Sequence, residues 1–468
     1  MKYNKKIFLA LLFVVILGAK SVYAEDVASI GSNKYSSLND AISAATDNSE
    51  IKLLTDITRI EVPAGKKISI DLNGNTVNPE AALATSLLPE TIAVKNYGTL
   101  TLKGSGKIKC YQYVDCIVNY ENSTLNVKDL EMEDANATEV IVNSGNISLT
   151  NVKITNDGYA KLFVNSEKGT FTVNSGTYSS KGLLENRGTM NLKGGTFNIH
   201  DTSLSSGYNY GTLNISGGTY SLSAYINNVN ILNISGGTFN GNRVAENYNP
   251  SGTYGTTNPI ITINNSNINT TNTPFSNASV TDNSKIVING GTISCSSDDY
   301  ILSDYGNNTE IVLNGGTLQG TNSKGIFISS KTKFTIGTND EEVSETSPVI
   351  NMPKGNLVGS LSQTSLYFYD GYINLDEQID NSIDVITPTD YYVAYDKNSD
   401  NSYKAYLKKG GNTDTINPKT STTPSSSTTI KVPDTFKGNK NIFKVIGLIT
   451  MILGTAVILN SMKSKKSR

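Results

Sequence analysis

The stretch LNISGGTYSL at residues 213–222 returns almost unchanged as LNISGGTFNG at residues 232–241. Looser copies lie on both sides of this pair. They read NLKGGTFNI at 191–199, VINGGTIS at 287–294 and VLNGGTLQG at 312–320. A segment that recurs at short, nearly regular spacing is typical of a solenoid, in which each repeat packs only against its neighbours.

The pattern inside each copy indicates which kind of solenoid forms. A short alternating run, as in Leu213-Asn214-Ile215, is followed by a glycine pair, which predicts one strand and then a turn. The first inward apolar residues of the copies lie 19 to 29 positions apart, a spacing that fits a coil of three short strands and three turns. They are Leu100, Leu125, Ile147, Phe171, Met190, Leu213, Leu232, Ile261, Ile286, Ile311 and Phe334. Neither a helical stripe nor the leucine-rich consensus appears, so we predict an all-β parallel β-helix.

Stacking of such coils predicts two rows of equivalent side chains. An apolar row should run inside the coils, with a row of threonine hydroxyls beside it. The apolar row comprises Tyr178, Phe197, Tyr220, Phe239, Ile293 and Leu318. The hydroxyl row comprises Thr177, Thr196, Thr219, Thr238, Thr292 and Thr317. These positions are interpreted as structural.

Both ends of the β-helix are expected to be capped. Ser36–Ala45 (SSLNDAISAA) is amphipathic, and Ser36 or Ser37 can cap it as a helix. Such a helix would cover strand edges that otherwise invite aggregation. We expect residues 25–66 to form the N-terminal cap, 67–340 the repeats, and 341–409 the last coils and C-terminal cap. The expected strands of these caps are Glu50–Leu54, Lys67–Leu72, Ser365–Asp370, Tyr391–Tyr395 and Tyr403–Leu407.

The first 24 residues have the features of a secretory signal peptide. Three early lysines precede the apolar run Ile7–Leu17, and Val22-Tyr23-Ala24 forms a small-residue cleavage site. The mature chain is therefore expected to begin after Ala24.

The other end of the chain predicts a stalk and a membrane anchor. Residues 410–436 are rich in Ser, Thr, Asn and Pro, which is typical of a flexible linker. Within 437–468, the run from Ile442 to Met462 is long enough for a transmembrane helix if Lys444 extends to the interface. The basic residues after it should remain in the cytoplasm.

Removing both ends leaves a markedly acidic extracellular part. Of the 39 lysines and arginines, four lie in 1–24 and seven in 437–468, and neither segment contains an acid. The remaining 28 basic residues face 41 acidic ones, a net charge of −13. Such a surface repels phosphate backbones, so we expect no nucleic-acid partner.

Three cysteines are too few for a disulfide framework. Cys110 and Cys116 could pair outside the cell, but we favour buried free thiols for them and for Cys295.

The extracellular part resembles right-handed parallel β-helix proteins of Gram-positive cell surfaces. The resemblance covers about residues 30–408 and rests on three groups of motifs. These are KYSSLNDAISAA with KISIDLNGNTV, the GGT coils, and YFYDGYI with YKAYL. It implies an adhesin-like surface protein. Repeated Asn, Thr and Tyr along a long stack of coils offer many weak contacts, so we expect a non-enzymatic protein on the outer face of the cell membrane or wall, with glycans or host or wall components as partners.

A second resemblance concerns the end of the stalk. Val432-Pro433-Asp434-Thr435, followed by an apolar segment and a basic tail, is similar to the Leu-Pro-x-Thr-Gly sorting signal that sortases cleave after threonine. Val432 and Phe436 depart from that pattern, Phe436 at the bond to be cut. Sortase linkage and a simple membrane anchor therefore both remain open.

The alternative function is a polysaccharide lyase or hydrolase, because other right-handed β-helices are such enzymes. A hydrolase needs two carboxylates flanking the glycosidic bond. The best acidic cluster is Asp298, Asp299 and Asp304, and we interpret Asp298 and Asp299 as a solvated turn. A second group, Asp129, Glu131, Glu133 and Asp134, is interpreted as a surface face, and the single histidine, His200, as a loop residue. We expect no catalytic residue, metal site or cofactor.

Overall fold

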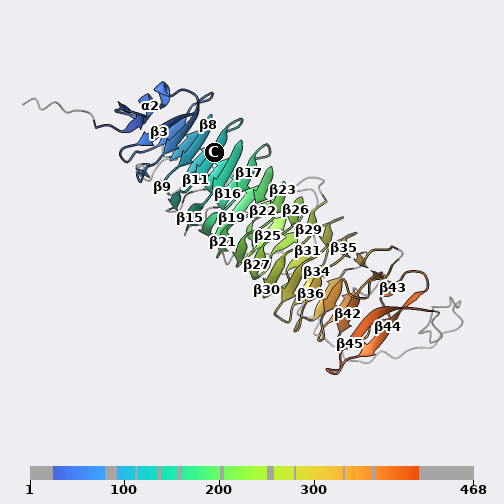
Figure 1. The fold of residues 1–468 in the computed structure, drawn as a ribbon. Coiled ribbons are helices and arrows are strands. Elements are labelled where there is room, and N and C mark those ends of the chain that lie inside the picture. The colour runs from blue at the N-terminus through green and yellow to red at the C-terminus, as the bar shows by residue number, and fades with distance from the viewer. Residues whose placement is uncertain are drawn as a thin grey trace, which may run out of the picture. The chain divides into compact units, whose positions relative to one another are not determined.

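The computed structural model describes residues 25–79, 92–110, 114–134, 137, 139–156, 158, 161–200, 205–249, 258–278, 281–329, 332–340, 342–359 and 364–410. Within these residues the strands form three long sheets of 17, 13 and 15 strands, in which parallel pairing dominates. Successive coils contribute one strand to each sheet (Figure 1). The predicted all-β fold with parallel strand repeats is confirmed at this level.

We call the three sheets A, B and C. Sheet A comprises β1 (Ala28–Ile30), β2 (Asn33–Tyr35), β3 (Ser49–Leu53), β5 (Lys67–Asp71), β8 (Thr99–Lys103), β11 (Thr124–Lys128), β14 (Asn146–Thr150), β17 (Thr170–Val173), β20 (Thr189–Leu192), β23 (Thr212–Ile215), β26 (Ile231–Ile234), β29 (Ile260–Ile263), β32 (Lys285–Ile288), β35 (Glu310–Leu313), β38 (Lys333–Ile336), β41 (Ser365–Phe368) and β43 (Asp384–Ile386).

Sheets B and C follow sheet A within each coil. Sheet B comprises β6 (Thr76–Val77), β9 (Lys107–Cys110), β12 (Glu131–Asp134), β15 (Val152–Asn156), β18 (Gly176–Ser180), β21 (Thr196–Ile199), β24 (Thr219–Leu222), β27 (Thr238–Gly241), β30 (Asn267–Thr270), β33 (Thr292–Cys295), β36 (Thr317–Gln319), β39 (Val349–Asn351), β42 (Tyr372–Leu375), β44 (Tyr391–Lys397) and β45 (Tyr403–Lys409). Sheet C comprises β4 (Ile60–Val62), β7 (Val94–Asn96), β10 (Ile117–Asn119), β13 (Glu139–Asn143), β16 (Lys161–Asn165), β19 (Gly182–Asn186), β22 (Ser205–Asn209), β25 (Tyr225–Asn228), β28 (Ala245–Asn247), β31 (Phe275–Asn277), β34 (Tyr300–Asp304), β37 (Gly325–Ile328) and β40 (Asn356–Gly359).

The inward apolar residues predicted from the repeats form one continuous row in sheet A. From Leu100 to Phe334 each pairs in register with the next, and all are buried. Alternation places the intervening side chains outside, as with Asn214 between Leu213 and Ile215. The register therefore follows from the side-chain period of two.

The predicted apolar row in sheet B is confirmed as well. Tyr178, Phe197, Tyr220 and Phe239 are fully buried, and their rings stack with centroids 4.8, 4.7 and 4.6 Å apart. Ile268 continues the row between Phe239 and Ile293, although its coil lacks the glycine pair. The paired threonines, such as Thr196 and Thr219, lie on the outer side of the same strands.

The glycine pairs turn the chain from sheet A to sheet B. Gly218 and Gly237 both have φ near 100°, in the left-handed region that favours glycine. A side chain on Gly218 would also meet the carbonyl oxygen of Gly195 in the coil before it, at 2.8 Å. The repeated glycine pair therefore marks a turn at which the backbones of successive coils lie close together.

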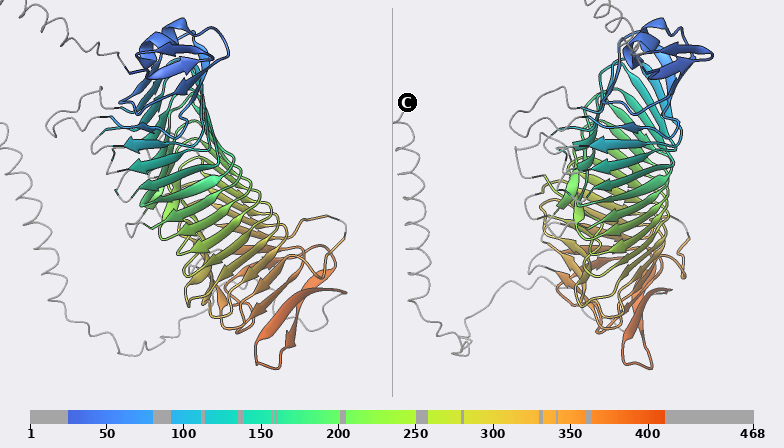
Figure 2. Two further views of the ribbon diagram at one scale, coloured as in Figure 1. Left: turned by 60° about the vertical axis from the view of Figure 1, so that its left-hand side comes forward. Right: turned by 90° about the vertical axis from the view of Figure 1, so that its left-hand side faces the viewer.

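The capping prediction for the N-terminal end is confirmed. Helix α2 spans Leu38–Ala44, and the Ser37 hydroxyl accepts a hydrogen bond from the Asp40 amide at 3.1 Å. The apolar side chains of α2 are buried against the first strands, β1 to β4. Figures 1 and 2 show this helix at the end of the coils where the first strands lie.

An antiparallel hairpin ends the described part of the chain. β44 pairs with β45, and β45 pairs with β42 of the last coils. Figure 2 shows the hairpin at the opposite end of the stack from α2. The predicted terminal strands are thus present, and both run two residues beyond their expected ends, to Lys397 and Lys409.

The expectation of three free thiols is wrong. Cys110 and Cys116 form a disulfide with a Cα–Cα distance of 5.0 Å, and both residues are buried. The turn from sheet B to sheet C brings these two inward positions together across six residues, a contact that sequence spacing alone leaves undecided. Cys295 is buried and free, as expected.

The predicted ends of the protein lie outside the described residues. This applies to the signal peptide with Ala24, to the stalk beyond Gly410, to Val432, Pro433, Asp434 and Thr435, and to the predicted transmembrane helix. In the part that the structure describes, no helix has the length and apolar character needed to cross a membrane.

Candidate functional site

The most regular polar feature of the chain is a row of buried asparagines at the ends of the sheet C strands. Each side-chain amide donates from Nδ2 to Oδ1 of the asparagine in the following coil, at 2.8–2.9 Å. We call this row the asparagine ladder. Its members are Asn96, Asn119, Asn143, Asn165, Asn186, Asn209, Asn228, Asn247 and Asn277, all fully buried.

The ladder also fixes the corner between sheets C and A. Asn209, for example, gives its second N–H to the carbonyl of Ile231, the first residue of β26 in sheet A of the following coil, at 2.8 Å. Several ladder asparagines are followed two residues later by a glycine. The missing side chain allows the backbone at this corner to lie close to the corner of the preceding coil. A side chain on Gly188 or Gly211 would meet backbone carbonyl oxygens of the preceding coil. The ladder therefore satisfies buried polar groups that would otherwise be costly.

The asparagine ladder ends on a carboxylate, Asp304. Asn277 donates to its Oδ2 at 3.2 Å, and the hydroxyls of Thr309 and Thr332 donate to the same oxygen at 2.5 and 3.2 Å. The Gly306 amide donates to Oδ1 at 2.9 Å. Burial raises the pKa of the Asp304 carboxyl, and these four hydrogen bonds oppose the rise without cancelling it.

Replacing Asp304 should therefore change how stability depends on pH. Because the pKa of Asp304 is raised on folding, its contribution to stability is full below about pH 4, the ordinary value, and is lost as pH rises through the folded-state pKa. Asp304→Asn cannot ionise, so the variant should gain stability relative to the natural chain as pH rises from about 4 to 7. Thermal unfolding midpoints across that range measure the difference.

Asp299 provides a control of opposite sign. Its pKa is lowered: partial burial favours a rise, but the Tyr300 amide, Thr273 and Lys324 together outweigh it. Asp299→Asn should therefore remove stability present at neutral pH, which the natural chain loses on acidification. Parallel pH profiles for Asp304→Asn and the natural chain would contradict the role assigned to Asp304.

The structure separates the three acids that the sequence places together. Asp304 points inward at the end of β34, whereas Asp298 is exposed and Asp299 lies on the turn before that strand, 3.4 Å from Lys324. The interpretation of Asp298 and Asp299 as a turn is confirmed. Grouping Asp304 with them is wrong, because Asp304 is buried at the end of a sheet C strand, in register with Asn277 of the asparagine ladder.

The second acidic group forms ion pairs between coils. Glu131 pairs with Lys153 at 2.8 Å and Glu133 with Lys107 at 3.0 Å, on the outer side of sheet B. Asp129 lies at the start of this strand with φ of 57° and accepts a hydrogen bond from Asn151. The surface interpretation is confirmed for these three acids; the side chain of Asp134 lies outside the described set.

His200 follows β21 as predicted. Its backbone amide donates to the Ser180 carbonyl at 3.0 Å, while its buried Nδ1 has no hydrogen-bond partner among the described residues. No group of three or more His, Cys, Asp or Glu side chains that could hold a metal ion occurs among the residues the structure describes.

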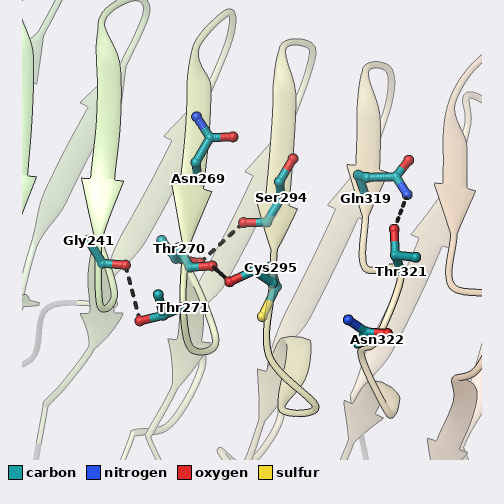
Figure 3. Close-up of a pocket in the computed structure, with 10 residues that line it drawn as sticks. Gly241, Asn269, Thr270, Thr271, Ser294, Cys295, Gln319, Thr321 and Asn322 are labelled. Carbon is teal, nitrogen blue, oxygen red and sulfur yellow. Dashed lines mark hydrogen bonds between the residues drawn. The ribbon is translucent and has the colours of Figure 1, made fainter.

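A groove of about 420 Å³ lies outside the coils where sheet B strands end. Figure 3 shows its lining, which is Gly241 of β27 together with side chains, most of them polar, from β30, β33 and β36 and from the turns after these strands. The lining residues are Gly241, Asn269, Thr270, Thr271, Ser294, Cys295, Ser296, Gln319, Thr321 and Asn322. No charged side chain lines it. Sequence analysis did not identify this groove.

The outer row of sheet B that meets the groove changes character along the coils. In β9 and β12 it carries Lys109 and Glu133, and in β15 Thr155. From β21 onward the row is neutral and rich in amides and hydroxyls. It comprises Asn198, Ser221, Asn240, Asn269, Ser294, Gln319 and Asn351, each paired in register with the next. We call this row the neutral row.

The asparagine ladder was missed at the sequence level, although a signal for it exists. Asn-x-Gly-Thr recurs at Asn96, Asn186 and Asn209, each time just before an inward apolar residue of sheet A. In a chain rich in asparagine this pattern is easily taken for surface loops. No family model, curated protein or solved structure matches the chain.

Proposed function

We propose that this chain is a non-enzymatic cell-surface protein of the adhesin-like kind, built on a right-handed parallel β-helix. The observation that carries the proposal is the neutral row of sheet B. It repeats hydrogen-bonding side chains at the coil spacing of about 4.8 Å, and many weak contacts at fixed spacing favour multivalent attachment. Glycans, or host or wall components, are the partners that such a surface suits.

The ion pairs and hydrogen bonds of the acidic residues support a non-enzymatic function. Glu131, Glu133, Glu185 and Glu310 form ion pairs with lysines, and Asp304 is enclosed by donors inside the coils. Carboxylates held in this way stabilise contacts between coils. These acidic residues therefore have a structural role, and the neutral row of sheet B binds the ligand.

The binding function is tested with the purified chain on a panel of polysaccharides and wall fragments. We expect retention of at least one ligand class without shortening of the polysaccharide chains. Shortening that is lost in Asp298→Asn with Asp299→Asn would replace the proposal with the lyase or hydrolase alternative. Retention and chain length are measured on the same samples, with and without calcium.

Anchoring at the cell surface forms a separate part of the proposal. It rests on the apolar run from Ile442 to Met462 and on the Val432-Pro433-Asp434-Thr435 motif. With Phe436 at the bond to be cut, we expect detergent alone to extract the protein from whole cells, as for a membrane helix. Release only by a wall-degrading enzyme would instead indicate sortase linkage.

A further inference from the structure

We propose that the groove at the end of the sheet B strands is a binding site for a neutral, hydroxyl-rich glycan. The inference rests on the proposed binding function and assigns it a place and a ligand class.

Three of the lining residues are small and share one register position in successive coils. Leu222 fills an inward position at the end of β24, and the residues that continue its register are Gly241, Thr270 and Cys295. Gly241 has φ of 140°, and a side chain there would meet the carbonyl oxygen of Leu222. Small residues therefore recur at this position over three adjacent coils along the groove.

The lining matches a ligand with many hydroxyl groups. Amides of Asn269, Gln319 and Asn322 supply donors and acceptors, as do the hydroxyls of Ser294 and Ser296. Gln319 is held in place because its Nε2 donates to Thr321 at 2.9 Å and its Oε1 accepts from Asn351 at 3.0 Å. Sugar hydroxyls both donate and accept, so they suit this mixed set of groups.

The charges around the groove favour a neutral ligand. Asp299 and Lys324, on the turns beside it, face each other at 3.4 Å, and Lys354 donates to Asn322 at 3.1 Å. The lining itself offers no fixed countercharge to a carboxylate or a sulfate. Desolvating such a group in the groove would be unfavourable.

Aromatic rings lie on the outer side of sheet C, whose strand β34 follows β33 in the same coil. Phe327 contacts Tyr300 and Tyr305, with ring centroids 5.6 and 4.7 Å away. Tyr305 is 45% exposed, although large apolar and aromatic side chains are rarely so exposed in the described residues. Sugar rings present an apolar C–H face that packs on such rings, which extends the site beyond the turn.

A glycan fits this surface better than a protein partner does. The fully buried core of a protein interface is apolar and rich in aromatic and Arg side chains. The neutral row instead presents short amides and hydroxyls, from Asn198 to Asn351. A protein partner is therefore an alternative outcome of the test.

The experiment measures affinity of the purified full chain for soluble oligosaccharides by calorimetry. The probes are neutral glucose, mannose and N-acetylglucosamine oligomers, with a galacturonate oligomer as the charged comparison. Ser294→Tyr should fill the groove, and Asn269→Ala with Gln319→Ala should remove two of its amides. Each change is expected to weaken neutral-glycan affinity about tenfold or more.

Ser148→Tyr is the matched control. Ser148 is also a half-buried, outward serine in mid-strand, but on β14 of sheet A. It should leave affinity unchanged, and thermal midpoints check that all variants fold. Equal glycan binding by all variants, or binding of the charged oligomer or of proteins only, would overturn the groove inference and leave the proposed binding function standing. Retention of no ligand would overturn both.

Discussion

Phe197→Ala is expected to destabilise the coils around β21 by about 3–5 kcal/mol. Phe197 is fully buried and lies between Tyr178 and Tyr220, with ring centroids 4.8 and 4.7 Å away. Truncation removes both stacking contacts and leaves a cavity that the parallel backbones on either side cannot close. Since neighbouring coils depend on each other, denaturant unfolding should show a lower midpoint.

Hydrogen exchange would locate the effect. Protection should fall most in β18, β21 and β24, and least near α2. Asn198→Ala is the control, because Asn198 is the next residue of the same strand and points to solvent; its effect should lie within about 0.5 kcal/mol. A loss below about 1 kcal/mol for Phe197→Ala would show that this aromatic row contributes little to stability.

Asn209→Leu is expected to cost about 2–4 kcal/mol. Asn209 accepts from Asn186 and donates to Asn228 and to the Ile231 carbonyl, each at 2.8 Å. Leucine occupies similar space but makes none of these bonds. The Oδ1 of Asn228 and the Ile231 carbonyl then lose a donor in a place where water has no room, so the cost exceeds that of an ordinary exposed bond.

The control for this variant is another asparagine in a row on the outside. Asn214 donates to Asn191 at 3.0 Å and accepts from Asn233 at 2.9 Å, on the outer side of sheet A. Water can replace these bonds, so Asn214→Leu should change the unfolding free energy by less than about 1 kcal/mol. Equal losses for the two leucine variants would contradict a special role for the buried asparagine ladder.

Two of the three sheets could be predicted well from the sequence. Most strands of sheets A and B alternate apolar and polar residues, and in several coils a glycine pair between them marks a turn with positive φ. Leu213 and Tyr220 were therefore assigned to the interior correctly. Sheet C strands lack such clear alternation: in β19, Leu183 and Leu184 are both buried.

The buried polar residues could not be predicted from residue type. Asparagine is usually a surface or turn residue, so neither Asn209 nor its counterparts were expected inside. Asp304 was assigned by its proximity to Asp299 in sequence rather than by strand position. The groove could not be predicted either, because it depends on the register of Gly241, Thr270 and Cys295 across three coils.

The side-chain hydrogen bonds of the asparagine ladder all run in one direction, and this restricts where a coil can be duplicated. Every amide donates toward the C-terminal coils, so the side-chain dipoles point the same way along the stack. Asp304 can only accept when ionised, and the residue next in register is Ile328. A coil duplicated between Asn96 and Asn277 would extend the polarised chain, whereas one inserted after Asp304 would find no polar partner. Duplication of coils that carry a ladder asparagine is thus compatible with the interior only on the N-terminal side of Asp304, whereas coils after it carry an apolar residue such as Ile328 at this position.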